Sequence, residues 1–560
     1  MLKRKFSAEE LSTPSKRPQH HVRDRLSILS DELLLRTLSF LPVQTLTICQ
    51  RLSRRLHALA GDSQLWKAAY YDRFVRPRAT RIPRIREQDK LAFSYSSRFS
   101  KWLDDERLVR RGRETNWKRQ YKLRHNWSRG SCHVSQVEIV REPTVPSPLV
   151  RLHADIVITA DPTNGLQAFA MEGEQYLVAT LELKGDDADG ERSPTPISLA
   201  IDDTSDGDGT TKIAIGFSNG VFGIYMLQEQ ERSFRRMYLH EPSTNGGISS
   251  IAYATPYLVT MTETQRLSLY CFPTLHTDND IIPTGHNIAS PQLLLSLKSQ
   301  TTWPPLSLSV RISSSIILTS IAYAVPTYLS GWSVGLQELR VALDGQIIQS
   351  RLTTAMNQGF SPSFSSPARS RSSRPGTPSR DGESGDFTPI SSLTEPTSLS
   401  YSHPYLLVSH PDNTLTLYMV SSTETELTIG PGNRLWGHTS SVTGAQVGDR
   451  GKAVSVSSHG GEIRIWELEG GISSKSSKRR VAAYQTSVQV RPERTVVHRT
   501  DAERMDSDRN EDTVSLRTGL TDMAPQIGRM KGWVGFDEEK VVVLSEEEQG
   551  AQALVVYDFS

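Results

Sequence analysis

The feature that most constrains the fold is a short pattern that recurs along most of the chain. Each copy has two apolar runs joined by a turn, which in most copies contains Gly, Asn or Asp, and the second run usually ends near an aromatic residue. Such runs are typical of β-strands, and a hairpin of this kind leaves apolar faces that only a neighbouring copy can cover. The repeats therefore predict one all-β domain. The copies are 156–169, 213–227, 258–272, 316–343, 406–420, 435–469 and 541–559.

The copy at 435–469 carries the most specific motif. It opens with Gly437-His438 and closes with Ile465-Trp466-Glu467, and in this it resembles a WD repeat. The resemblance implies a buried hydrogen-bond network between the His, a Ser or Thr hydroxyl and the Trp, with the hydroxyl supplied by Ser455 or Ser457. The turn 459–461 lacks the Asp of that family, so we expect an incomplete network. The predicted structural residues of the repeat are Gly437, His438, Ser457 and Trp466.

Taken together, the copies resemble a WD40-like β-propeller of about seven degenerate blades. Their spacing varies between roughly 40 and 90 residues, against about 40–45 for regular WD repeats, and insertions account for the excess. We expect 131–140 to supply an outer strand that closes the ring with the C-terminal segment.

A second pattern, in 24–74, is helical. Ser30 is a candidate N-cap, and Asp31 and Glu32 follow in the first turn, where the helix dipole favours acids. Leucines then recur every three or four residues through three short predicted helices, with Pro42 ending the first. So small a unit cannot bury this much leucine by itself, so the surplus must contact the rest of the chain or a partner.

This segment resembles an F-box, the helical module that docks a protein onto the adaptor Skp1 of a ubiquitin ligase. The acidic start, the leucine-rich helix, the Leu41-Pro42 pair and the closing Leu65-Trp66 pair match that family, whereas Ser30 stands where it usually has proline. The alternative is an ordinary helical hairpin of the core. The resemblance implies that the Skp1-binding residues are Leu29, Leu33, Leu34, Leu38, Leu41, Pro42, Leu46, Leu52, Leu65 and Trp66.

Between these regions, 76–124 is rich in Arg and Lys, with Trp102, Trp117, Tyr121 and Trp127 interleaved or following closely. We favour a helical linker that packs its aromatic rings on the F-box and the propeller. The alternative is a patch that binds nucleic acid or an acidic protein. The predicted order is a disordered basic tail (1–23), an F-box (24–74), a basic helical linker (75–130) and a propeller (131–560).

Two stretches inside the propeller, 354–392 and 470–528, have the composition of disordered inserts. The first contains Ser-Pro and Thr-Pro pairs, which are candidate sites for proline-directed kinases. These candidate phosphorylation sites are Ser361, Ser366, Thr377 and Thr388. The basic runs at 3–5 and 16–17 resemble a nuclear import signal, so we expect the protein in the cytoplasm, the nucleus or both.

Composition and motifs exclude several other classes. The net charge of +2 gives no global field to recruit nucleic acid or membrane, and no apolar run has the roughly 20 residues of a membrane helix. The cysteines, Cys49, Cys132 and Cys271, are too far apart for a disulfide framework or a metal motif. We find no phosphate-binding loop, nucleophile elbow or metalloprotease motif, so we expect no catalysis, cofactor or metal.

These features make the chain similar to fungal-like F-box/WD-repeat proteins. That resemblance implies a non-catalytic substrate receptor of an SCF-type E3 ubiquitin ligase. The F-box would bind Skp1, and through it cullin and the RING subunit, while the propeller would bind a protein substrate for ubiquitination and proteasomal degradation. The alternatives are a Skp1-binding or propeller scaffold with no ligase role and, less favoured, a nucleic-acid-associated adaptor acting through 76–124.

Overall fold

The computed structural model describes residues 28–75, 115–140, 145–171, 176–183, 194–202, 209–272, 290–299, 303–313, 315–327, 331–355, 395–448, 451–458, 461–468, 487–492, 529–546 and 550–560. The chain divides into two compact units, a small helical one and a large β-sheet one. The predicted N-terminal tail, the basic stretch 76–114 and all four candidate phosphorylation sites lie outside the described residues.

The helical unit contains four short helices between residues 31 and 70, where the spacing of leucines predicted three. They are α2 (Asp31–Leu38), α3 (Val43–Cys49), α4 (Arg54–Ala60) and α5 (Ser63–Tyr70), and a π-helical turn, Tyr71–Val75, follows. Ser30 is the N-cap residue of α2 but its side chain makes no capping bond, whereas Ser53 and Asp62 accept backbone N–H groups at the starts of α4 and α5. Side-chain caps therefore mark the starts of α4 and α5, but not those of α2 and α3.

Two apolar clusters form the interior of this unit. Leu38, Leu46 and Ala60 bring α2, α3 and α4 together, and the Trp66 indole donates a 2.8 Å hydrogen bond to the Ala60 carbonyl. The second cluster joins Trp66 and Tyr70 of α5 to Trp117 and Tyr121 of α9 (Trp117–Arg129). The first five residues of α9 thus belong to the helical unit, and the remainder belongs to the large unit.

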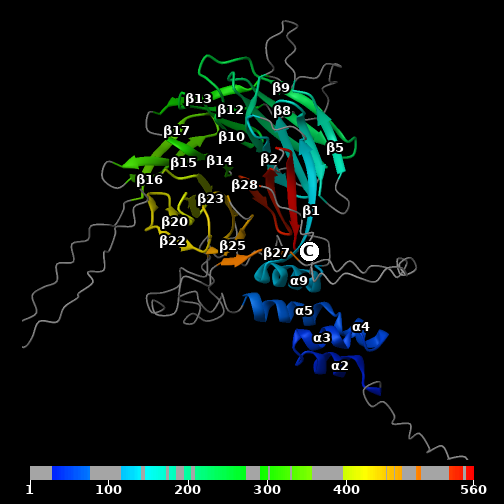
Figure 1. Cartoon of the computed structure of the whole chain (residues 1–560). Coiled ribbons are helices and arrows are strands. Elements are labelled where there is room, and N and C mark those ends of the chain that lie inside the picture. The colour runs from blue at the N-terminus through cyan, green and yellow to red at the C-terminus, as the bar shows by residue number, and fades with distance from the viewer. Residues whose placement is uncertain are drawn as a thin grey trace, which may run out of the picture. The chain divides into compact units, whose positions relative to one another are not determined.

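The large unit is a ring of seven antiparallel sheets, the blades of a β-propeller (Figure 1). Blade 1 is β2 (Leu149–His153), β3 (Ile156–Asp161), β4 (Gly165–Ala170) and β5 (Tyr176–Leu181). Blade 2 is β6 (Pro196–Ile201), β7 (Thr210–Phe217), β8 (Phe222–Gln228) and β9 (Ser233–Leu239). Blade 3 is β10 (Ser250–Ala254), β11 (Tyr257–Met261), β12 (Arg266–Cys271) and β13 (Gln292–Lys298). Blade 4 is β14 (Trp303–Ile312), β15 (Ile316–Thr327), β16 (Gly331–Ala342) and β17 (Ile347–Thr354).

Blades 5 and 7 each have a fifth strand, and blade 6 has four strands with a short outer one. Blade 5 is β18 (Ser398–Ser402), β19 (Tyr405–Ser409) and β20 (Thr414–Ser422), with an outer edge shared by β21 (Leu427–Ile429) and β22 (Asn433–Trp436). Blade 6 is β23 (Val442–Val447), β24 (Lys452–Ser457), β25 (Ile463–Glu467) and β26 (Ser487–Gln489). Blade 7 is β28 (Arg529–Phe536), β29 (Lys540–Glu546), β30 (Gln552–Asp558), β1 (Ser131–Val140) and β27 (Arg491–Pro492).

Each of the seven repeats predicted from the sequence contains the second and third strands of one blade. The predicted insert 470–528 is wrong at 487–492, because these residues form β26 and β27. They are needed there because β26 is the outer strand of blade 6 and β27 covers the edge of β1. The predicted insert 354–392 likewise begins inside β17, which ends at Thr354.

The ring closes by pairing the two ends of the domain, as predicted for 131–140. Strand β1 pairs antiparallel with β30, from His133 opposite Asp558 to Val140 opposite Gln552. Figure 1 shows β1, in cyan, beside the red C-terminal strands. Blade 7 is therefore built from both ends of the propeller sequence, which removes the open ends that a linear array of sheets would have.

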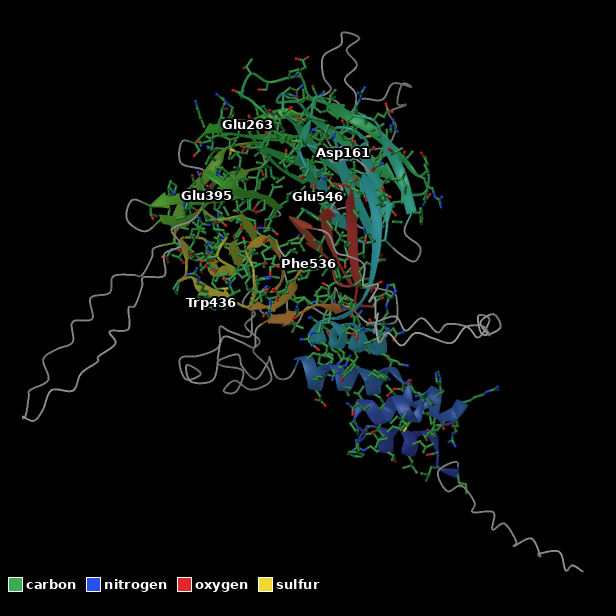
Figure 2. All side chains as sticks on the ribbon, viewed as in Figure 1. Asp161, Glu263, Glu395, Trp436, Phe536 and Glu546 are labelled. Carbon is green, nitrogen blue, oxygen red and sulfur yellow. The ribbon has the colours of Figure 1, made fainter. Side chains whose placement is uncertain are left out.

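The interior of the ring consists of seven apolar clusters, one between each pair of neighbouring blades. The cluster between blades 6 and 7 also receives α9, whose Trp127 ring stacks on Phe559 at 4.2 Å and donates to the Glu538 carbonyl. Phe536, labelled in Figure 2, lies 6.4 Å from the Trp127 ring. Trp117 and Tyr121 of α9 are thus buried in the helical unit, and Trp127 is buried in the large unit.

Blade 4 contains a buried ion pair that no sequence motif announced. Glu338 of β16 is fully buried and accepts hydrogen bonds from Arg351 of β17 at 2.6 Å and from Ser422 of β20 at 2.8 Å. Arg351 also donates to the Thr423 carbonyl at 2.7 Å. The pair therefore joins blade 4 to blade 5 and satisfies charges that would be costly to bury alone.

Candidate functional site

The helical unit exposes five large apolar side chains among its described residues. Leu33 and Phe40 are seven residues apart, two helical turns, along and just beyond α2. Ile48 and Leu52 are four residues apart along and just beyond α3. Phe40 is 72% exposed and Leu52 is 66% exposed, and large apolar side chains exposed together in one short segment indicate a binding site. The exposed apolar set of this unit is Ile28, Leu33, Phe40, Ile48 and Leu52.

Basic side chains flank this exposed apolar set. The Arg36 guanidinium lies 4.8 Å from the centre of the Phe40 ring, and Arg51 and Arg54 are exposed near Leu52 in the sequence. Asp31 is engaged by Arg55, which donates to its carboxylate at 2.6 Å and also holds the Leu29 carbonyl. A partner for this surface would therefore offer apolar contacts together with acidic groups.

The ten predicted Skp1-binding residues fall into three groups by exposure in the structure. Leu34, Leu38, Leu46 and Trp66 are buried and shape the unit from within, and Leu29, Leu41 and Leu65 are partly buried. Leu33, Pro42 and Leu52 are exposed. Sequence reasoning missed Ile28, Phe40 and Ile48, although the spacing of Leu33 and Phe40 was a usable signal. The assignment of these residues to a partner stays a prediction.

The predicted WD network exists in blade 6, with one correction and one addition. The hydroxyl is that of Ser455, not Ser457: it lies 2.5 Å from His438 Nε2 and accepts the Trp466 indole N–H at 2.7 Å. Ser457 instead lies 3.4 Å from the Glu462 carbonyl. Gly437 directly precedes this network and packs against Arg464 and Ser487.

Glu462 completes the network that we expected to lack an acid. Its carboxylate accepts the Thr439 N–H and hydroxyl at 3.0 Å, lies 3.6 Å from His438 Nδ1, and forms a 2.7 Å ion pair with Arg464. Burial lowers the pKa of His438 to about 4. Burial alone would raise the pKa of Glu462, but the Thr439 hydrogen bonds and Arg464 outweigh it and lower that pKa.

One end of the ring gathers the hairpins that join the second and third strands of each blade. Among them are carboxylates labelled in Figure 2: Asp161 before the β3–β4 turn, Glu263 in the β11–β12 turn and Glu546 at the end of β29. Two arginines near this end, Arg434 and Arg464, are already paired with Asp412 and Glu462. Neither arginine is therefore available as a ready site for a phosphate group.

Other kinds of site find little support in the part of the chain that the structure describes. Across these ranges no three His, Cys, Asp or Glu side chains are placed to hold a metal ion. No helix within the same ranges is long and apolar enough to cross a membrane. The exposed apolar set of the helical unit is the strongest candidate site.

Comparison with known proteins places both units. Residues 31–72 match an F-box-like domain, and residues 132–560 match the family described as the F-box protein pof12 β-propeller. A curated relative, F-box protein pof12 of Schizosaccharomyces pombe, is 42% identical over 64 residues, which are 11% of this chain and 14% of the relative. The alignment thus spans about one seventh of the length of that relative.

Two solved structures that resemble the chain do so with low sequence identity and low TM-scores. The WD40 β-propeller domain of Doa1 covers 76% of this chain and 95% of its own, with 10% identity and a TM-score of 0.36. Sqt1 of Saccharomyces cerevisiae covers 76% and 97%, with 9% identity and a TM-score of 0.35. Because the matched propeller model spans well over half of the chain, the protein belongs to the family of the F-box protein pof12 β-propeller.

Proposed function

We propose that the protein is a substrate receptor of an SCF-type ubiquitin ligase, with the exposed apolar set of the helical unit binding a Skp1-type adaptor. The observation that carries the proposal is the exposure of Leu33, Phe40, Ile48 and Leu52 within the segment that matches an F-box-like domain. Burying each such side chain in an interface would contribute about 1.5–3 kcal/mol. A small helical unit can therefore dock tightly through few residues.

In this proposal the propeller binds the protein to be ubiquitinated and has no catalytic role. The protein supplies proximity and orientation, while the cullin, the RING subunit and the ubiquitin-loaded enzyme supply the transfer chemistry. Arg434 is paired with Asp412 and Arg464 with Glu462, so neither arginine supports binding of a phosphorylated substrate by the propeller. The place of action, in the cytoplasm, the nucleus or both, remains a prediction.

The first experiment measures binding of the full chain to purified Skp1 by calorimetry. We expect Leu33→Glu with Leu52→Glu to weaken binding about a hundredfold or more, because two charges would enter an apolar interface. The matched control is Leu177→Glu, which places the same charge on an exposed leucine of blade 1. Equal binding by intact chain and double variant, or none by the intact chain, would remove the proposal.

A second experiment separates a ligase receptor from a scaffold. Intact chain and double variant are each mixed with Skp1, cullin and the RING subunit, and the complexes are resolved by size-exclusion chromatography. A receptor brings cullin and the RING subunit into one complex with the intact chain, and the double variant does not. Binding of Skp1 without cullin would instead establish a Skp1-bound scaffold.

A further inference from the structure

Strand β17 is the outer strand of blade 4 and carries three exposed large apolar side chains, more than any other outer strand that the structure describes. It is eight residues long and lies at the edge of its sheet, where its one hydrogen-bonded neighbour among the described strands is β16. Four large apolar side chains on it and on the preceding turn are exposed, with Ile348 at 56% and Leu352 at 59%. We call this surface the β17 rim; its residues are Leu343, Ile347, Ile348 and Leu352.

The β17 rim lacks the usual protection of an edge strand. Natural edge strands carry exposed charges or are short, which prevents another strand from pairing with them. The one charged residue of β17, Arg351, is only 8% exposed because its guanidinium is turned inward onto Glu338. By contrast, β9 contains two arginines, and β26 has only three residues. In blade 1, Arg232 lies over Tyr176 of the outer strand.

The same fold shows that an outer edge of this ring accepts an added strand. In blade 7, β27 pairs in parallel with the free edge of β1, through Arg491 opposite Ser131 and Pro492 opposite Cys132. Main-chain hydrogen bonds provide affinity in such additions, and alternate side chains provide selectivity. On β17 the alternate positions Ile348 and Leu352 would contact the added strand.

Charges around the β17 rim indicate the chemistry of the occupant. Asp344 in the turn before β17 is exposed, and so are Glu424 and Glu426 in the turn whose Thr423 carbonyl accepts from Arg351. Arg340 donates to backbone carbonyls of that same turn, so among the described charges there the three carboxylates outnumber it. A second copy of this chain would bring its own carboxylates against these, which is unfavourable.

We propose that the β17 rim binds an extended segment of another protein, apolar at alternate positions and carrying Lys or Arg at its ends. The segment adds to the free edge of blade 4 as a fifth strand. This surface is separate from the exposed apolar set of the helical unit. The result of the Skp1-binding experiment therefore does not decide this proposal.

The test uses the full chain and a labelled synthetic peptide that alternates Val and Thr and carries two Lys at each end. Binding is followed by fluorescence anisotropy. We expect Ile348→Lys with Leu352→Lys to weaken binding at least about tenfold, because the edge becomes charged and loses its apolar contacts. The control Leu177→Lys alters the outer strand of blade 1 and should leave binding unchanged. Leu352→Thr, which retains strand propensity, should weaken it less.

Two altered peptides test the mode of binding. A proline at the centre removes a main-chain N–H, and Glu in place of the terminal Lys reverses the charges, so both should bind at least about tenfold more weakly. Absence of saturable binding, or equal binding by the double variant or by the proline peptide, overturns the proposal. Concentration-dependent self-association of the chain alone, lost in the double variant, would assign the rim to a second copy and also overturn it.

Discussion

Blades 4 and 6 both bury polar side chains between their strands, but they pair those side chains in different ways. In blade 6 the buried polar groups are His438, Ser455 and Trp466, joined by neutral hydrogen bonds and supported by Glu462 at the margin. In blade 4 a fully buried carboxylate, Glu338, is matched by a guanidinium, Arg351. Both arrangements satisfy polar atoms between strands. Only the first leaves a recognisable sequence motif, so a blade can lose its motif and still hold its place in the ring.

The largest expected effect is on the ion pair. Glu338→Ala leaves the Arg351 charge buried without its partner, and we expect the free energy of unfolding to fall by about 3–5 kcal/mol. Chemical denaturation followed by tryptophan fluorescence measures it. The double change Glu338→Leu with Arg351→Met should recover most of the loss, since a packed apolar pair needs no counter-charge. No recovery in the double variant would contradict this account of blade 4.

The next effect concerns the hydroxyl of blade 6. Ser455→Ala leaves the Trp466 N–H and the His438 ring nitrogen without their shared partner, so the free energy of unfolding should fall by about 1–3 kcal/mol. The same denaturation measurement applies. The loss should be smaller than for Glu338→Ala, because neutral groups cost less to bury unpaired than a charge. An equal or larger loss would reverse the ranking of the two blades.

Acid should also lower the stability that blade 6 derives from neutral His438. Burial lowers the pKa of His438 to about 4, so the folded state binds fewer protons than the unfolded state between pH 4 and the ordinary value of 6.5. Stability from this group is therefore complete above pH 6.5 and falls as the pH drops toward 4, by about 1 kcal/mol at pH 5.5.

Comparing His438→Gln with the intact protein at pH 7 and pH 5.5 isolates this group. The difference in unfolding free energy between the two proteins should shrink at the lower pH, because the glutamine does not titrate. A difference that stays constant with pH would show that His438 is not held neutral by the fold.

The smallest expected loss of stability is for Ser457, the serine that was predicted from the sequence. The Ser457 hydroxyl lies 3.4 Å from the Glu462 carbonyl, a longer contact than either contact of Ser455, so Ser457→Ala should lower the free energy of unfolding by less than Ser455→Ala. Thermal unfolding of Ser455→Ala and Ser457→Ala side by side measures the contrast. Equal effects would mean that both hydroxyls belong to one network.

The sequence predicted the architecture better than the sites. The alternation of apolar residues located the central hairpin of every blade, because each hairpin is a local feature with its own turn. It could not choose between Ser455 and Ser457, which lie two residues apart and so face the same side of β24. The pairing register of β24 with β25 places Ser455, not Ser457, within reach of the Trp466 indole, and the sequence of β24 alone does not set that register.

The buried ion pair and the exposed leucines were harder to foresee for related reasons. Glu338 and Arg351 are thirteen residues apart on adjoining strands, a separation that carries no motif. In the helical unit leucines occupy both the inward and the outward sides, so spacing alone could not separate buried Leu34 from exposed Leu33. Both distinctions arise from packing between elements, which no local pattern records.

The pairing of β1 with β30 has a consequence for biosynthesis. His133 leaves the ribosome early and its partner Asp558 leaves near the end of the domain, so β1 waits for roughly 20–90 s at ordinary rates of translation. Blades 1 to 6 can assemble in order during that interval, while blade 7 has to wait for the last strand. A nascent chain that stalls keeps an unpaired β1 edge, which quality-control factors can recognise as a sign of incomplete synthesis.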